Sequence, residues 1–146
     1  MYKRHKRTMV LSFFMVSIIA FVLKWEYTMI AEISVTVASI AIGVYIAAVS
    51  SLLGSEYAKD LKHETDSEYH NKTMLGVLAD YFRLASVSCI LLIVVSCLFV
   101  IPSDITISYK VLRVISSLSY GLFAANILLI RYVLVFLINS LGKAVK

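Results

Sequence analysis

Four apolar runs dominate the chain, and charged or turn-forming residues separate them. A helix of about 20 apolar residues is long enough to cross the roughly 30 Å hydrocarbon core of a bilayer. The shorter first and last runs gain length at their edges, because Lys24 and Arg131 can extend their stems along the helix and hold their charge at the interface. The pattern predicts four transmembrane helices, at about residues 8–25, 33–54, 84–102 and 112–134.

The connection over residues 55–83 is the longest segment between predicted spans, and its apolar positions have a helical spacing. Leu53, Tyr57 and Leu61 recur every four residues, so we expect the second span to continue for about two turns before a break near residues 65–71. The apolar positions of residues 74–82 then form an amphipathic lead into the third span. We expect this lead to lie on the inner leaflet or against a neighbouring subunit.

The last helix remains apolar beyond the length that a bilayer requires. Arg131 follows Arg113 by 18 residues, which is about 27 Å of helix. Residues 132–138 after it are still apolar. We therefore expect this emerging tail to be covered by protein, and together with the amphipathic lead it favours an assembly of several chains.

The composition agrees with this pattern and limits what the chain can hold. Of the 146 residues, 60% are hydrophobic, against about 45–50% in an average soluble domain. Four spans use about 80 residues, so a separate soluble catalytic domain has no room. We therefore predict an all-α integral membrane protein, a four-transmembrane-helix bundle forming one domain over residues 1–146 with helical extensions on the cytoplasmic side.

The distribution of Lys and Arg predicts the orientation. Eleven of the 14 lie on the side of the two ends and the central connection, and three (Lys24, Lys110 and Arg113) lie on the other side. Cytoplasmic segments carry the excess of basic residues, so we expect a multi-pass protein of the plasma (inner) membrane with both termini in the cytoplasm. The basic head at residues 3–7 serves this orientation, and no nucleic-acid partner is expected.

Two spans carry the same pattern of small residues one helical turn apart. Because lipid tails are as apolar as leucine, helices in a bilayer associate where small residues allow close approach. We expect these positions to pack helices within or between subunits, with a pore lined by their small polar faces as the alternative. The candidate assembly residues are Ser39, Gly43 and Ala47 in the second span and Ser117, Gly121 and Ala125 in the fourth.

Polar groups within the spans are few. Tyr120 and Asn126 are candidates to line a pore, although the default role of Asn126 is a hydrogen bond between helices. No carboxylate, lysine or histidine lies in the middle of an apolar run. Proton-coupled exporters, rotary ring subunits and ion pumps usually need such a group, so these classes are not expected.

The central connection carries acidic residues and two histidines that could form a cytoplasmic collar, responsive to cations or pH. These are Glu56, Asp60, His63, Glu64 and His70. Their spacing lacks the His-Glu-x-x-His pattern of a zinc site, and solvated charge is the simpler interpretation. Cys89 and Cys97 lie in an apolar run and are expected to be packing residues. We expect no metal, no cofactor and no enzymatic activity.

Two functions remain open from the sequence. The first is a homo-oligomeric pore, channel or membrane-permeabilising effector. Small four-span proteins of this shape resemble holin-type proteins and the membrane effectors of bacterial phage-defence loci, in architecture only. The second is a noncatalytic membrane subunit or scaffold that binds a membrane or cytoplasmic partner protein through residues 55–83.

Overall fold

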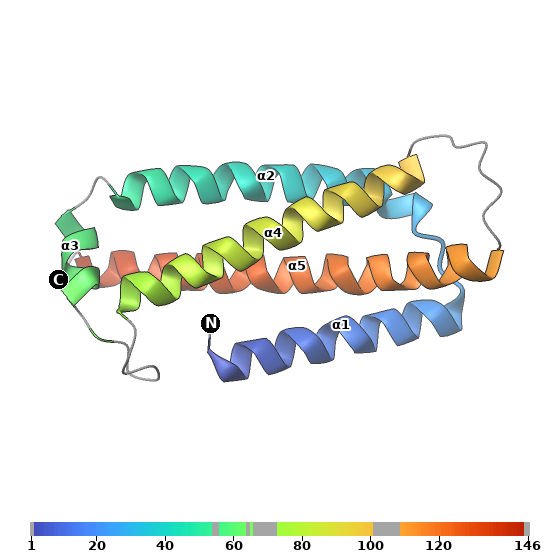
Figure 1. The fold of residues 1–146 in the computed structure, drawn as a ribbon, viewed down its shortest axis with the longest axis horizontal. Coiled ribbons are helices and arrows are strands. Elements are labelled where there is room, and N and C mark those ends of the chain that lie inside the picture. Colours follow the sequence, from blue (N-terminus) through green and yellow to red (C-terminus); the bar gives the residue numbers. More distant parts are fainter. Residues whose placement is uncertain (1, 54–55, 64, 66–72, 101–108, 145–146) are drawn as a thin grey trace.

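The computed structural model describes residues 2–53, 56–63, 65, 73–100 and 109–144. These residues form five helices and no named strand: α1 (Lys3–Leu23), α2 (Thr28–Leu53), α3 (Glu56–His63), α4 (Met74–Val100) and α5 (Tyr109–Ala144) (Figure 1). All but α3 are long and apolar enough to cross a membrane. The predicted all-α architecture with four such helices is therefore confirmed, and it indicates a membrane location.

The four long helices lie in a row rather than in a closed square. α1 packs against α5, α5 against α4, and α4 against α2, with a smaller contact between α2 and α5, and Figure 1 shows α4 crossing obliquely between α5 and α2. The helices α1 and α2 therefore form the two edges of the row. Each edge helix has a wide face that no other described helix covers.

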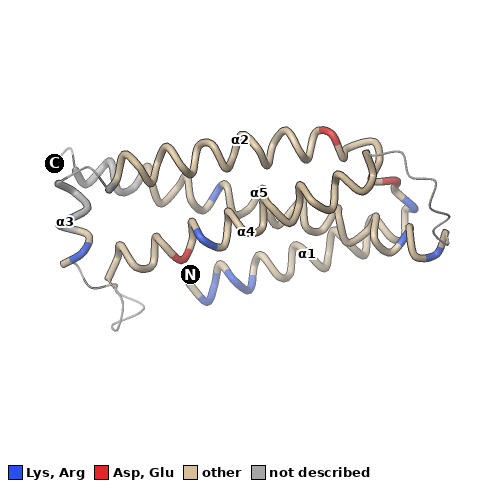
Figure 2. The backbone as a smooth tube through the Cα atoms, turned by 45° about the horizontal axis from the view of Figure 1, so that its top comes forward, with Lys and Arg blue, Asp and Glu red and all other residues tan. Residues whose placement is uncertain are grey.

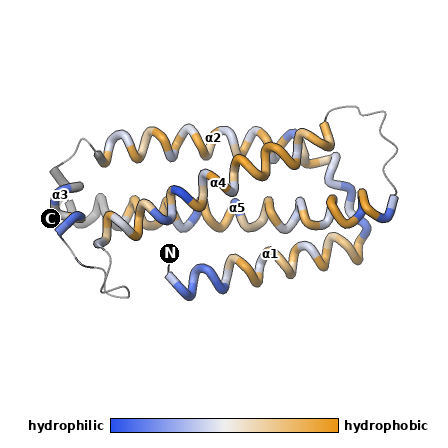
Figure 3. Tube along the Cα trace, in the orientation of Figure 1, coloured by the Kyte–Doolittle hydropathy of each residue, from blue (hydrophilic) through white to orange (hydrophobic). Residues whose placement is uncertain are grey.

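The two ends of the bundle are polar and the middle is apolar. The basic residues of α1 lie toward the end where α5 finishes, and the short helix α3 lies at that end, which we call the terminal end (Figure 2). The opposite end, the turn end, holds the connection at residues 24–27 and the start of α5. Between the ends, Figure 3 shows apolar residues along every long helix, as expected where the hydrocarbon core of a bilayer would lie.

Small residues allow α2 and α4 to pack closely. Tyr27, just before α2, is buried, and so is every third or fourth residue of α2 after it, namely Ala31, Ser34, Ala38, Ala41 and Tyr45. On α4 the buried positions opposite are Ala85, Cys89, Leu92 and Ser96. Seven of these ten residues are Ala, Ser or Cys, which suits close helix packing where side-chain hydrophobicity supplies no driving force.

The central connection differs from its prediction. α2 ends at Leu53, and α3 is a separate helix that turns away from the α2 axis (Figure 1). Leu61 of α3 is fully buried, and α3 packs against α4 as well as α2. The predicted straight continuation of the second span is therefore wrong, because α3 turns and buries Leu61 against the bundle. The predicted break falls mostly outside the described residues.

The start of α4, which forms the amphipathic lead, packs against part of the emerging tail of α5. Leu78, Tyr81 and Phe82 at the start of α4 are buried, and the ring of Tyr81 lies 6.4 Å from that of Phe136 in α5. Val133 is also fully buried. Within one chain the tail is thus covered only in part, because Leu134, Val135 and Ile138 remain exposed.

Candidate functional site

The small-residue stripe of α5 lies inside the bundle. Ser117, Gly121 and Ala125 are all buried. A Cβ atom placed on Gly121 would lie 2.6 Å from the carbonyl oxygen of Phe13 in α1 and would overlap Ser17 Oγ. Gly121 therefore permits the close contact between α5 and α1, and this stripe packs helices within the chain.

The matching stripe of α2 lies on the outside of the bundle. Ser39, Gly43 and Ala47 are exposed, and a Cβ atom on Gly43 would have no neighbour within 4 Å. The structure therefore does not bring the two stripes together. The role of the α2 stripe in assembly stays a prediction.

The exposed face of α2 carries a longer polar stripe, which the sequence analysis missed. At 100° per residue its members fall within an arc of about 60°, roughly 150° from the face that packs against α4. The Thr36 hydroxyl donates a hydrogen bond to the Glu32 carbonyl oxygen, 3.0 Å away. We call these residues the α2 polar stripe: Glu32, Thr36, Ser39, Gly43 and Ser50, all of them exposed.

The other edge helix has a different outward face. The exposed large residues of the middle of α1 are apolar, including Phe14, Met15 and Ile18. In a bilayer such a face is suited to lipid, whereas hydroxyls and a carboxylate are costly to place against hydrocarbon. The outward surface of α2 also exposes large apolar residues, among them Ile33, Ile40 and Ile46, so the two edges differ in the polar stripe that α2 adds.

Asn126 lies at the contact between α4 and α5 and is only 1% exposed. Its amide nitrogen donates to the carbonyl oxygens of Ser88 and Leu122, at 3.2 and 3.1 Å. Its amide oxygen accepts a hydrogen bond from the Cys89 thiol at 3.1 Å. Within one chain Asn126 therefore joins two helices, and its role as a pore-lining residue stays untested.

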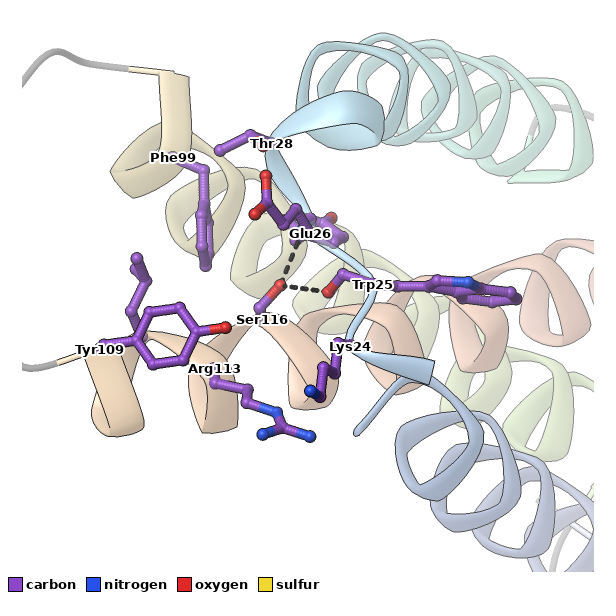
Figure 4. A pocket seen from close by; sticks show the side chains of 10 residues that line it. Lys24, Trp25, Glu26, Thr28, Phe99, Tyr109, Arg113 and Ser116 are labelled. Atoms are coloured by element: carbon purple, nitrogen blue, oxygen red, sulfur yellow. Dashed lines mark hydrogen bonds between the residues drawn. The ribbon is translucent and has the colours of Figure 1, made fainter. Parts of the chain in front are cut away.

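Tyr120 belongs to a hydrogen-bond network at the turn end. Its hydroxyl donates to the carbonyl oxygen of Glu26 at 3.2 Å. Ser116 Oγ accepts from the Tyr27 backbone N–H at 2.7 Å and donates to the Trp25 carbonyl oxygen at 3.2 Å (Figure 4). Together with the 2.9 Å contact between the Tyr27 hydroxyl and Ser96 Oγ, these bonds fix the connection between α1 and α2 onto α4 and α5.

A pocket of about 260 Å³ lies beside this network. Its walls come from the α1–α2 connection, the end of α4 and the start of α5, and the charged groups on them are Lys24, Glu26 and Arg113. The Arg113 guanidinium donates to the Phe21 carbonyl oxygen at 2.8 Å and lies 4.5 Å from the centre of the Phe21 ring. From the sequence, Lys24 and Arg113 were expected only at the membrane interface, where they bear on span length and orientation.

An aromatic cluster holds the beginning of α1 at the terminal end. His5 stacks on Tyr132 with 4.2 Å between the ring centres. Its Nδ1 lies 2.6 Å from the Tyr81 hydroxyl, which also accepts a hydrogen bond from the Tyr2 backbone N–H at 3.2 Å. The cluster ties α1 to both α4 and α5.

Only part of the predicted cytoplasmic collar lies within the described residues. Glu64 and His70 lie outside the described residues, and for Glu56 and Asp60 only the helical backbone of α3 is described. His63 is exposed at the end of α3. The described residues contain no group of three or more His, Cys, Asp and Glu side chains able to hold a metal ion.

Comparisons with protein-family models, with curated proteins and with solved structures give no match to this chain.

Proposed function

We propose that the protein is a multi-pass membrane protein whose copies assemble around an aqueous pore, with the α2 polar stripe facing the pore. The observation that carries this proposal is the chemical difference between the two edges of the helix row. The outward face of α1 is apolar, whereas the outward face of α2 presents Glu32, Thr36 and Ser39. Facing hydrocarbon, these groups would lose their hydration; facing a water-filled channel, they keep it.

The geometry of α2 supports a lining role. Its buried face is already used against α4, so its outward face is free to meet other copies or water. Gly43 lies near the middle of the helix, where the lack of a side chain lets neighbouring backbones approach closely or leaves room at the pore axis. The hydroxyls of Thr36, Ser39 and Ser50 can replace part of the hydration shell of a permeating solute.

The proposal also predicts the sign of the conducted charge. Glu32 lies one turn after the start of α2, near the turn end of the bundle. In a ring of copies, these carboxylates would surround the mouth of the pore, and rings of Asp or Glu favour cations. We propose a cation-preferring pore with both termini in the cytoplasm, a sidedness that a reporter fused after Lys146 tests directly.

The test is reconstitution of the purified protein into liposomes loaded with a potassium-sensitive dye, with subunit counting by native mass spectrometry. The proposal predicts potassium flux from particles that contain several copies. The matched variant Glu32→Gln keeps the size of the side chain and removes its charge, so cation preference should fall while assembly persists. A monomer that supports no flux, and that leaves the membrane potential of expressing cells intact while retaining a protein partner, would instead support the scaffold function.

A further inference from the structure

The pocket at the turn end combines cationic groups and a carboxylate at the level where the apolar helices finish. α1 ends at Leu23 and α5 begins at Tyr109, so in the proposed membrane orientation the pocket lies at the depth of the lipid headgroups. We propose that this pocket binds the headgroup of a phospholipid with a primary amine, its phosphate against Lys24 and Arg113 and its ammonium group against Glu26. This inference depends on the membrane insertion proposed above.

The guanidinium group of Arg113 is fixed in place at the pocket wall, where it can bind an anion. One terminal nitrogen of its guanidinium donates to the Phe21 carbonyl oxygen, while its Nε is buried and has no hydrogen-bond partner. An unpaired donor of this kind is costly, and because it has almost no accessible surface, an anion in the pocket would meet the terminal nitrogens of the guanidinium instead. Because guanidinium groups present several donors in a fixed plane, Arg is well suited to phosphate oxygens.

Lys24 adds a second cation from a backbone position that usually favours glycine. It caps α1 in the left-handed conformation, with a φ of 56° and a ψ of 38°. Glycine adopts this conformation without steric cost, whereas a lysine adopts it at some cost, and here the lysine lines the pocket. In the view of Figure 4 the charged ends of Lys24 and Arg113 point the same way, away from the Glu26 carboxylate.

The remaining walls suit the rest of a lipid. Phe99 and Leu112 line the pocket and offer apolar surface to the glycerol and the first acyl carbons. A volume of about 260 Å³ lies below the roughly 300–1,000 Å³ of typical small-molecule sites. The pocket is therefore of a size for a headgroup rather than for a larger ligand.

Native mass spectrometry of the full-length protein in detergent tests this assignment, with phosphatidylethanolamine and phosphatidylcholine added separately. Both lipids carry the phosphate, but only the first has N–H donors for Glu26. We expect stronger retention of phosphatidylethanolamine. Glu26→Gln should remove the preference between the two lipids, and Lys24→Gln should weaken both by about tenfold or more, the effect of losing a charged hydrogen bond.

Two controls separate this site from general charge effects. Lys110→Gln removes an exposed cation from the first turn of α5 that does not line the pocket, and it should leave lipid retention unchanged. Arg113→Gln should behave like Lys24→Gln, and Lys24→Gln keeps the test valid if the Arg113 variant fails to fold. Equal retention by Lys24→Gln and the native protein, or full displacement of lipid by inorganic phosphate, would overturn the proposal. Lipid retention is read from mass, so its loss is distinguishable from a loss of ion flux.

Discussion

Gly121 of α5 lies directly against Ser17 of α1. A Cβ atom at this glycine would overlap Ser17 Oγ and approach the Phe13 carbonyl oxygen to 2.6 Å. The Phe13 oxygen belongs to the backbone of α1 and cannot rotate away. Gly43, at the same place in the matching pattern of α2, has open space instead. Two identical sequence patterns therefore serve different surfaces, one inside the chain and one outside it.

This difference predicts unequal effects of the same substitution. Gly121→Ala should lower the free energy of unfolding by about 1–3 kcal/mol, the usual cost of inserting atoms into a packed contact. Gly43→Ala is the matched control: its Cβ meets no neighbour and alanine is the better helix former, so the unfolding midpoint of the detergent-dispersed protein should not fall. Thermal unfolding followed by circular dichroism measures both, and equal losses would contradict the packing described for α5 and α1.

Ser116 is predicted to stabilise the connection between α1 and α2. Ser116→Ala leaves the buried backbone N–H of Tyr27 without its acceptor, which costs about 1–3 kcal/mol. Ser119→Ala is the control, because Ser119 is equally buried but donates only to the Ile115 carbonyl oxygen of its own helix. The unfolding midpoint should fall clearly further for Ser116→Ala. A larger effect of Ser119→Ala would refute the assigned role.

Asn126 and Cys89 should be energetically coupled. Asn126→Ala removes three hydrogen bonds, and single bonds between membrane helices contribute about 0.6–2 kcal/mol. A double-mutant cycle with Cys89→Ala should give a combined loss smaller than the sum of the two single losses, because both variants remove the same thiol–amide bond. Cys97→Ala with Asn126→Ala should be additive. Additivity in both cycles would mean that the thiol contributes nothing.

The aromatic cluster should protect the first turns of α1 from hydrogen exchange. Tyr81→Phe removes the hydroxyl that contacts His5 Nδ1 and the Tyr2 backbone N–H. Hydrogen exchange over the first two turns of α1 should speed up severalfold, because local opening loses two of its restraints. Tyr109→Phe, at a residue that is 68% exposed, should not change exchange there. Unchanged protection in Tyr81→Phe would show that the helix start is held by other contacts.

The apolar runs were enough to predict the number and type of the long helices. The predicted span bounds followed hydrophobicity alone. Helices such as Lys3–Leu23 and Met74–Val100 begin before the predicted spans, because the polar residues there continue the helical hydrogen bonds. The end of α2 was harder to predict. Leu61 has the spacing of a continued helix, yet α3 folds back because its apolar residue is buried against the bundle.

The functional surfaces were less predictable, because a periodic pattern does not tell which face meets a neighbour. Ser39 and Ser117 occupy equivalent positions in the two patterns, and only packing separates the exposed residue from the buried one. The α2 polar stripe had a signal in the sequence, the helical spacing of Glu32, Thr36 and Ser39, but the first of these lies outside the apolar run. Contacts such as that of Ser116 with Tyr27 join residues far apart in the chain and leave no local pattern.

If the outward face of α2 lines an aqueous pore, a thiol placed on that face should be accessible to water-soluble reagents. Cysteine accessibility during current recording measures this. Cys97→Ala provides the background, since Cys89 is fully buried. Ser39→Cys and Ile18→Cys then place thiols on the outward faces of α2 and α1. If α2 lines the pore, a charged methanethiosulfonate reagent should reduce the current through Ser39→Cys and leave Ile18→Cys unchanged. A current that responds equally in both variants, or the absence of any current from the native protein, would contradict this lining role.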